Sequence, residues 1–469
     1  MKRTKILATF GPSTDSPGTI RRLVAGGVNG FRVNCSHGDK ATFAGAVRTI
    51  RHGVKGAEYP ISILFDISGS KLRLATFDGE LAVKTGEALT LTSTDTRLSA
   101  RTVSVNHPAI LASLKPGERV FIDDGQIAFR VTRTGSGGAI LRALNPGVLT
   151  SAKGINLPDT NLAIPTITPK DKQDIQTAVR LGADLIALSF VRSGDDVIEA
   201  KKLVSKAGGR QAVIAKLEKR EAIEHLDDIL LVADGIMIAR GDLGVELPPA
   251  ELPHLQREII RKANRHHKPV IVATQMLESM RFSPRATRAE INDVATAVFG
   301  FVDTVMLSAE TATGEYPVEA VTVMSEVIAA TEKAAPTQRA ALDEHLISSP
   351  NARGIAEAVR SAIDVSPAAV ICAFTTSGYS AELISMLFPP QLVIALTPDP
   401  EVMRKLALRR SIYAVKIAQP RSFDDMKRTV DRVCHQHKLA RKNERVIITG
   451  GVPFGSTAPT NFMMFHEVG

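Results

Sequence analysis

The two residues best placed for chemistry are Lys216 and Glu218, which end the apolar run of IAKLE. Residues at i and i+2 on an extended strand point to the same side, so this ammonium and carboxylate share one surface. Buried charges are unfavourable unless they are paired or bind an ion. Glu218 suits a hard cation and Lys216 suits a developing negative charge, although a structural ion pair would use the same residues.

A second polar group, ARGDLG, closes another apolar run. Asp242 supplies a further carboxylate, and two carboxylates from neighbouring strands leave positions open for water and substrate around Mg²⁺. Gly241 and Gly244 permit a tight turn whose backbone N–H groups can bind an anion where a helix begins. An ordinary glycine-rich turn would look similar.

Polar residues also follow other apolar runs. Arg32 offers a rigid donor fork suited to a phosphoryl group, and Asn34 and Ser36 point the same way on an extended strand. Asp66 and Thr274 end two further runs. Spacing alone therefore predicts one site for a divalent metal and an anion, which would serve either phosphoryl transfer or enolate chemistry.

Eight apolar, β-branched runs can position these groups. Continuous hydrophobicity is typical of parallel strands covered on both faces, and helical patterns such as 170–181 and 251–266 lie between the runs. The sequence therefore predicts an α/β protein with a (β/α)8 TIM barrel, whose chemistry lies at the carboxyl ends of the strands. The runs are 4–10, 30–36, 61–67, 184–190, 211–218, 235–241, 269–275 and 304–310.

The interval between the third and fourth runs indicates an insertion. Short alternating segments and turn signals there predict a small β-barrel lid domain over the barrel mouth. After the eighth run, β-branched runs alternate with helical patterns, which is typical of an open α/β domain. We expect a catalytic barrel at 1–68 and 159–344, a lid at 69–158, and a C-terminal α/β domain for regulation or oligomerisation at 345–469.

Composition is typical of a globular protein, with 44% hydrophobic and 23% charged residues among 469. No apolar run reaches the roughly 18 residues of a membrane helix. The opening segment lacks the apolar stretch and cleavage site of a signal peptide. We expect a cytoplasmic protein without a membrane partner.

The formal net charge is +9, and thirteen basic residues against four acidic ones lie between Arg404 and Arg445. A solvated basic face would have this composition, as would a site for an anionic effector or an acidic partner. Aromatic residues make up only 4% of the chain and Trp is absent, which disfavours nucleic-acid binding because single-strand platforms use stacking rings.

Ten segments, in order along nearly the whole chain, resemble the pyruvate kinase family. GIMIARGDLGVE and VATQMLESM are highly specific, and the domain plan is also that of the family. The other segments are TKILATFGPST, FRVNCSHG, FIDDGQI, AKGINLP, ALSFVR, IAKLE, TRAEINDVATAV and VMLSAETATGEYP.

The resemblance implies transfer of a phosphoryl group from phosphoenolpyruvate to ADP in glycolysis, giving pyruvate and ATP. Lys216 would stabilise the phosphoryl group and the enolate, and Arg32 would hold the transferred phosphoryl group. Thr274 would lie near the enolate face that receives a proton. The backbone of Gly241 and Asp242 would cradle the substrate carboxylate.

The remaining implied residues surround this centre. Glu218 and Asp242 would hold Mg²⁺ or Mn²⁺. Asp124 and Lys153 would close the lid over nucleotide and phosphates. Arg73 is expected among the catalytic residues, and Asn34 and Ser189 among those that bind substrate.

One departure from the family concerns a monovalent cation. Residues 66–73 read DISGSKLR where the family has DTKGPEIR. The family's K⁺ site corresponds to Asn34, Ser36, Asp66 and the carbonyl of Ile67. A glutamate at position 71 goes with K⁺ dependence and a lysine with independence. We expect that K⁺ is not required, because the tethered ammonium of Lys71 can supply the charge.

A second departure concerns regulation. A loop that resembles the family's effector phosphate loop contains Thr375, Thr376, Ser377, Gly378 and Ser380. The closing segment 450–457 lacks the arginine and tryptophan of members that respond to fructose 1,6-bisphosphate. Another sugar phosphate, a nucleotide monophosphate or no effector at all are the alternatives. The family is typically a homotetramer, so we expect one here.

Two other functions have to be weighed. A metal-dependent enolate lyase or aldolase would need the same carboxylates, but it gives no reason for the lid or for Lys216 beside Glu218. A catalytically impaired regulatory homologue is suggested by Ser68, Ser70 and the altered effector segment. Such a homologue should have lost some of the key residues, yet the chain keeps Arg32, Thr274, Lys216, Glu218 and Asp242.

Overall fold

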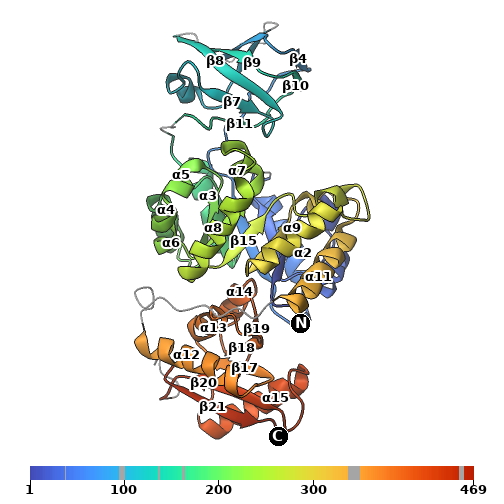
Figure 1. The fold of residues 1–469 in the computed structure, drawn as a ribbon, viewed down its shortest axis with the longest axis vertical. Coiled ribbons are helices and arrows are strands. Elements are labelled where there is room, and N and C mark those ends of the chain that lie inside the picture. Colours follow the sequence, from blue (N-terminus) through green and yellow to red (C-terminus); the bar gives the residue numbers. More distant parts are fainter. Residues whose placement is uncertain (37, 94–100, 136–137, 161–163, 336–348, 454–458) are drawn as a thin grey trace.

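A computed structural model describes residues 1–36, 38–93, 101–135, 138–160, 164–335, 349–453 and 459–469. Three parts follow one another along the long axis of the molecule (Figure 1). A small β part lies at one end, a barrel lies in the middle, and a second α/β part lies at the other end.

Eight parallel strands close into the barrel in the order β1-β16-β15-β14-β13-β12-β3-β2. The predicted (β/α)8 barrel is therefore confirmed, and nearly every residue of these strands is buried, as their continuous apolar runs require. The strands are β1 (Lys5–Thr9), β2 (Gly30–Asn34), β3 (Ser62–Ile67), β12 (Leu185–Leu188), β13 (Ala212–Leu217), β14 (Gly235–Ala239), β15 (Val270–Ala273) and β16 (Thr304–Leu307).

Helices surround the barrel. Capping residues fix several starts: Thr168 and Asp171 form a capping box at α3, and Thr287 and Glu290 form another at α9. The helices are α1 (Pro17–Ala25), α2 (Lys40–Gly53), α3 (Pro169–Arg180), α4 (Gly194–Lys206), α5 (Arg220–Glu224), α6 (Leu226–Val232), α7 (Arg240–Glu246), α8 (Leu252–Arg265), α9 (Arg288–Phe299), α10 (Ala309–Ala312) and α11 (Pro317–Ala334), with 3₁₀ turns η1 (Pro12–Thr14) and η3 (Glu278–Arg281).

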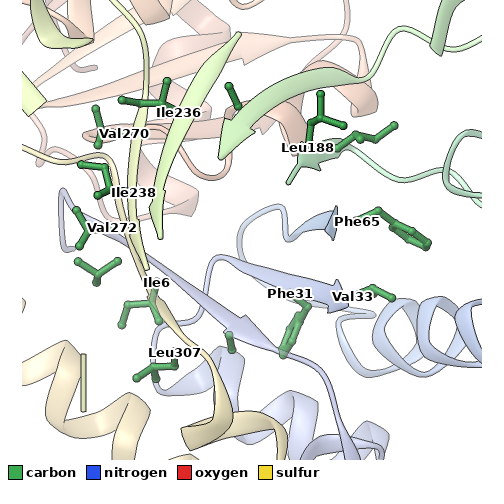
Figure 2. Packing of buried hydrophobic residues seen from close by; sticks show 14 of the residues in the cluster. Ile6, Phe31, Val33, Phe65, Leu188, Ile236, Ile238, Val270, Val272 and Leu307 are labelled. Carbon is green, nitrogen blue, oxygen red and sulfur yellow. The ribbon is translucent and has the colours of Figure 1, made fainter. Parts of the chain in front are cut away.

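The barrel has two apolar layers. Side chains such as Ile6, Phe31 and Leu307 pack between the strands and the surrounding helices (Figure 2). Alternate residues such as Leu7 point inside the barrel, where they pack in one cluster with Leu408 from the C-terminal part of the chain. The Leu408 carbonyl also accepts a 2.8 Å hydrogen bond from Thr304 Oγ1, so this segment closes the amino-terminal end of the barrel.

The insertion after β3 has its own core around Phe129 and Leu141. Its strands form a six-stranded sheet, β11-β7-β8-β9-β5-β6, and a two-stranded sheet, β10-β4. The elements are β4 (Leu81–Val83), β5 (Ala88–Thr92), β6 (Thr102–Ser104), η2 (Pro108–Ala112), β7 (Arg119–Ile122), β8 (Ile127–Gly135), β9 (Gly138–Ala143), β10 (Gly147–Leu149) and β11 (Ile155–Asn156).

The C-terminal part is an open sheet in the order β19-β18-β17-β20-β21, as the alternating pattern predicted. Its edge strand β21 runs antiparallel and was not predicted. The boundary expected at 344/345 lies outside the described residues, and the other domain boundaries stay predictions. The elements are α12 (Pro350–Val365), β17 (Val370–Phe374), α13 (Tyr379–Ser385), β18 (Leu392–Thr397), α14 (Pro400–Leu406), β19 (Ile412–Lys416), α15 (Phe423–Gln436), β20 (Arg445–Gly450) and β21 (Phe462–Glu467).

Within the described ranges, none of the helices combines the length and hydrophobicity that crossing a bilayer demands.

Candidate active site

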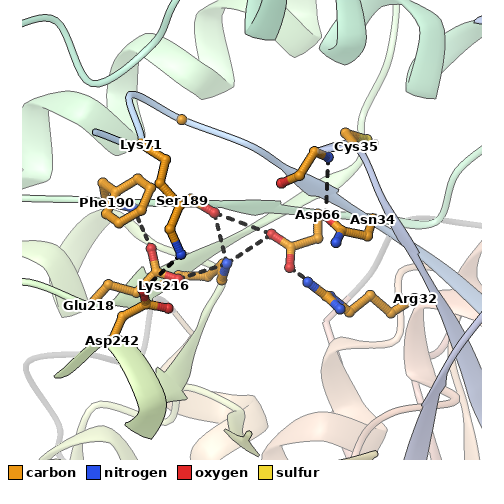
Figure 3. Close-up of polar contacts among 12 residues, drawn as sticks. Arg32, Asn34, Cys35, Asp66, Lys71, Ser189, Phe190, Lys216, Glu218 and Asp242 are labelled. Atoms are coloured by element: carbon orange, nitrogen blue, oxygen red, sulfur yellow. Dashed lines mark hydrogen bonds and ion pairs between the residues drawn. The ribbon is translucent and has the colours of Figure 1, made fainter. Parts of the chain in front are cut away.

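Lys216 lies at the centre of a charged cluster at the carboxyl end of the barrel (Figure 3). Its Nζ is 2.8 Å from Glu218 Oε1 and 3.0 Å from Asp66 Oδ1. It also donates a 2.7 Å hydrogen bond to Ser189 Oγ. Strand β13 carries Lys216, while Asp66 and Ser189 come from β3 and the end of β12, so three neighbouring strands build the cluster.

The cluster keeps Lys216 charged although it is buried. Burial opposes the ammonium, but the carboxylates of Asp66 and Glu218 outweigh it and raise the pKa of Lys216. Burial likewise opposes the carboxylate of Asp66, but Lys216 and Arg32 lower its pKa. A permanent cation therefore faces the barrel mouth, which suits the stabilisation of negative charge.

Arg32 lies on the other side of Asp66 from Lys216 (Figure 3). Its Nε donates a 2.6 Å hydrogen bond to Asp66 Oδ2, and one terminal nitrogen donates to Thr9 Oγ1 at 3.4 Å. These bonds fix the plane of the guanidinium, and they place the predicted phosphoryl-binding residue within the Lys216 cluster.

Glu218 and Asp242 form the pair of carboxylates predicted to hold a metal. Glu218 Oε2 accepts a 2.8 Å hydrogen bond from the Phe190 N–H, and Asp242 lies in the first turn of α7 after the neighbouring strand β14. Burial raises the pKa of Glu218, Lys216 opposes this, and the charge of Asp242 adds to it. A divalent cation would relieve the repulsion between the two carboxylates.

The donor set therefore fits Mg²⁺ or Mn²⁺, which prefer carboxylate oxygens and retain water ligands. Among the described residues, no group of three or more His, Cys, Asp or Glu side chains is arranged to hold a metal. A divalent ion on Glu218 and Asp242 would accordingly take its other ligands from water and substrate.

Thr274 meets Gly241 beside this pair. Thr274 Oγ1 accepts a 2.8 Å hydrogen bond from the Gly241 N–H and donates one of 2.6 Å to the Ala273 carbonyl. Thr274 has a φ of 69° and Gln275 one of 53°, so two consecutive residues adopt the left-handed region after β15. A β-branched residue is strained there, which is typical of functional sites.

The residues predicted to hold a monovalent cation, Asn34, Ser36, Asp66 and Ile67, lie next to one another at the ends of β2 and β3. Asn34 pairs in register with Asp66, and Ile67 follows on β3. Asn34 Oδ1 accepts a 3.1 Å hydrogen bond from the Ser36 N–H. Lys71 turns elsewhere: within the described part of the chain its ammonium contacts Asp242, at 3.3 Å, and not this group.

The lid residues lie near Lys71. Lys153 Nζ is 2.8 Å from Asp123 Oδ1, and Asp123 and Asp124 both have positive φ in the turn after β7. Arg73 donates a 3.0 Å hydrogen bond to the Ala152 carbonyl. The side chain of Arg73 therefore bonds the backbone of the insertion at Ala152. Asp124 and Lys153 belong to the same insertion.

The effector candidates lie in the C-terminal part, in the loop after β17 and in the first turn of α13. Thr375 Oγ1 accepts a 2.9 Å hydrogen bond from the Gly378 N–H, and Ser377 Oγ accepts one of 3.4 Å from Tyr379. Ser380 Oγ contacts Thr460 Oγ1, while Thr376 is exposed. Residues 454–457 of the closing segment 450–457 lie outside the described residues.

Sequence reasoning missed Phe190 and Glu246. Phe190 has a φ of 55°, which turns its N–H to Glu218. Buried Glu246 accepts from Lys219 Nζ at 2.7 Å and from Asn156 Nδ2 of the lid at 3.1 Å. The sequence signal for this second ion pair was a lysine directly after Glu218, in KLEK.

This fold and site define the class of (β/α)8 barrel enzymes that have a charged barrel mouth and a β insertion after the third strand. Comparison with known families narrows the class. Residues 1–321 match the family model "Pyruvate kinase, barrel domain", and residues 353–466 match "Pyruvate kinase, alpha/beta domain". The chain belongs to the pyruvate kinase family.

Named relatives agree over the whole length. A pyruvate kinase from Methylorubrum extorquens is 40% identical over 98% of this chain and 96% of its own. One from Agrobacterium vitis is 40% identical over 100% of this chain and 99% of its own. One from Staphylococcus saprophyticus is 37% identical over 100% of this chain and 81% of its own.

Proposed function

We propose that the chain transfers the phosphoryl group of phosphoenolpyruvate to ADP, giving pyruvate and ATP as a step of glycolysis. The observation that carries this proposal is the buried Lys216, held as a cation by Asp66 and Glu218 at the barrel mouth. An enolate lyase or aldolase would share the carboxylates, but it would not need an inserted lid that excludes water.

Phosphoryl transfer depends mainly on positioning and charge neutralisation. The bond between phosphorus and the enol oxygen breaks while a terminal oxygen of ADP bonds to the phosphorus. Arg32 holds the moving phosphoryl group, and Lys216 stabilises charge on it and on the enolate oxygen that is left. Their shared partner Asp66 keeps the two cations at a fixed separation.

The enolate then takes a proton at its methylene carbon to become pyruvate. Thr274 is the hydroxyl beside this face in our proposal. The backbone of Gly241 and Asp242 holds the substrate carboxylate, supported by the bond from the Gly241 N–H to Thr274. Ser189 and Asn34 are the remaining proposed substrate-binding residues. Ser189 contacts Lys216, and Asn34 is paired in register with Asp66.

Glu218 and Asp242 would hold Mg²⁺ or Mn²⁺, which when bound supplies positive charge to the phosphoryl oxygens. Asp124 and Lys153 of the lid would meet the nucleotide, with Arg73 fixing the lid backbone at Ala152. Lid closure would exclude water, which could otherwise take the phosphoryl group.

We also propose that turnover does not require K⁺, because Lys71 brings a tethered ammonium into the same mouth. Assembly into a homotetramer is proposed from the family alone. An anionic effector at the loop of residues 375–380 stays a proposal.

The three described cysteines are free, as is typical of the cytoplasm, to which we assign the protein.

A coupled assay with phosphoenolpyruvate, ADP and Mg²⁺ tests the main proposal. The expected result is pyruvate and ATP in equal amounts, with no product when ADP is omitted. Cleavage of a carbon–carbon bond without ADP would favour the lyase or aldolase. Absence of turnover in a folded protein would favour the impaired homologue.

A further inference from the structure

Lys71 extends from the base of the lid to the metal-ligand pair. Its N–H donates to the Gly69 carbonyl at 3.0 Å, and its carbonyl accepts from Asn106 Nδ2 at 3.0 Å, so its backbone belongs to the lid base. The side chain passes Gly154, where an added Cβ would lie 3.4 Å from Lys71 Cε. The ammonium reaches Asp242 Oδ1 at 3.3 Å.

A second contact joins the lid to the same short helix. Asn156 at the end of β11 donates a 3.1 Å hydrogen bond to Glu246 Oε1. Asp242 and Glu246 are four residues apart on α7, so they lie on one face of that helix. Lys71, Asp242 and Asn156 line one cleft between the lid and the barrel, together with Phe190 and Lys219.

The two contacts differ in strength. The carboxylate of Glu246 is only 2% exposed and is also bonded by Lys219 at 2.7 Å. The side chains of Lys71 and Asp242 are 31% and 21% exposed, and their 3.3 Å separation is long for an ion pair. Partly exposed pairs are weak, and a divalent ion can displace them.

We propose that Lys71 is a positioning residue that acts as the counter-ion of Asp242 until a divalent metal displaces it, so that metal binding and the lid base are coupled. This rests on the proposed function only in taking Asp242 as a metal ligand. A metal bound to Asp242 Oδ1 would face the ammonium as a like charge, and the two cations therefore exclude one another. The contact between Asn156 and Glu246 persists, as do the hydrogen bonds from Gly69 to Asp171 and from Ser70 to Pro165, so the lid base loses one of the two side-chain contacts that it makes with α7.

Such a coupling is reciprocal: whatever draws Lys71 away from Asp242 must tighten metal binding by the same factor. An anionic ligand in the cleft would attract the released ammonium. Metal and anion would then bind cooperatively without any direct contact between the metal and the lid.

The test is Mn²⁺ binding followed by electron paramagnetic resonance, without phosphoenolpyruvate or ADP. Lys71→Met should bind Mn²⁺ about 3- to 5-fold more tightly than the wild type, the factor expected for a partly exposed pair. Lys71→Arg keeps the positive charge, so this variant should bind Mn²⁺ with the affinity of the wild type. Lys219→Met removes a cation from the same cleft but leaves Asp242 Oδ1 paired, and it should change the affinity by less than about 2-fold.

Hydrogen exchange of residues 69–75 provides the second readout. Mn²⁺ should speed exchange there in the wild type and leave Lys71→Met unchanged, because the contact is already absent. Equal Mn²⁺ affinity in the wild type and Lys71→Met, or equal exchange with and without Mn²⁺ in the wild type, would overturn the inference.

Glu218→Gln separates this inference from the proposed function. If Glu218→Gln weakens Mn²⁺ binding while Lys71→Met leaves it unchanged, only the inference fails. If Glu218→Gln also leaves binding unchanged, the assigned metal site fails and the inference with it.

Discussion

Asp66 Oδ2 accepts a 2.6 Å hydrogen bond from Arg32 Nε. The other oxygen of this carboxylate lies 3.0 Å from the ammonium of Lys216, so one buried anion sets the distance between the two cations that the reaction needs. Positioning of this kind contributes strongly to phosphoryl transfer.

Asp66→Asn should therefore lower kcat by about 10- to 100-fold, with a smaller change in the KM for phosphoenolpyruvate. The amide can hydrogen-bond but cannot hold both cations. Steady-state kinetics checks this. Asp184→Asn is the matched control: this buried carboxylate bonds Arg51 and Arg404 near the amino-terminal end of the barrel, and its loss should leave kcat unchanged. Equal kcat for the wild type and Asp66→Asn would refute the positioning role.

Turnover should persist without K⁺. The ammonium of Lys71 lies in the active-site mouth and supplies a positive charge that needs no added ion. The measurement is the coupled assay in a tetraalkylammonium buffer, compared with the same buffer plus K⁺. Near-complete loss of activity that K⁺ restores would contradict the prediction.

Leu408→Ala should lower the free energy of unfolding by about 3 kcal/mol, because it opens a cavity inside the amino-terminal end of the barrel. Urea unfolding measures this. Val365→Ala, at a side chain that is 87% exposed, should change stability by less than about 0.5 kcal/mol. A Leu408→Ala protein as stable as the wild type would show that this residue does not close the barrel.

Lys5→Met tests the lowered pKa of a buried lysine at the amino-terminal end of the barrel. Burial lowers the pKa of Lys5 from its ordinary 10.5 to about 8, and its Nζ donates to the Ile412 carbonyl at 2.7 Å. Between these pH values the unfolded chain binds more protons than the folded one, so stability rises with pH. The wild type should gain about 2–3 kcal/mol relative to Lys5→Met between pH 8 and 10.5.

Urea unfolding across this range measures the difference. Glu332, Lys2, Arg410 and Asp303 surround Lys5 electrostatically and are present in both proteins. Loss of the hydrogen bond to Ile412 adds a constant offset, so the slope of the difference against pH is the readout. Parallel pH profiles for the two proteins would refute the lowered pKa.

The barrel and the centre of the site could be predicted from the sequence because the patterns that indicate them span only a few neighbouring residues. Continuous apolar runs indicated the strands, and the i, i+2 spacing placed Lys216 and Glu218 on one face. Strand β21 was missed because it pairs at an edge and its side chains are only partly buried.

The two contacts between the lid and α7 could not be predicted in the same way. Lys71 meets Asp242, which is 171 positions away in the chain, and Asn156 meets Glu246, 90 positions away. Such contacts depend on how the lid is set on the barrel, and no local pattern encodes that. The positive φ of Phe190 likewise follows from packing and not from its residue type.

Lys216→Met tests the central claim most directly, since it removes the charge and keeps the volume of the side chain. Turnover of phosphoenolpyruvate, ADP and Mg²⁺ should fall by at least about 1,000-fold, as expected for a principal electrostatic group, while circular dichroism and the urea midpoint show a folded protein. Turnover within about 10-fold of the wild type in the folded variant would contradict the assignment of Lys216 as the cation that stabilises the transferred group.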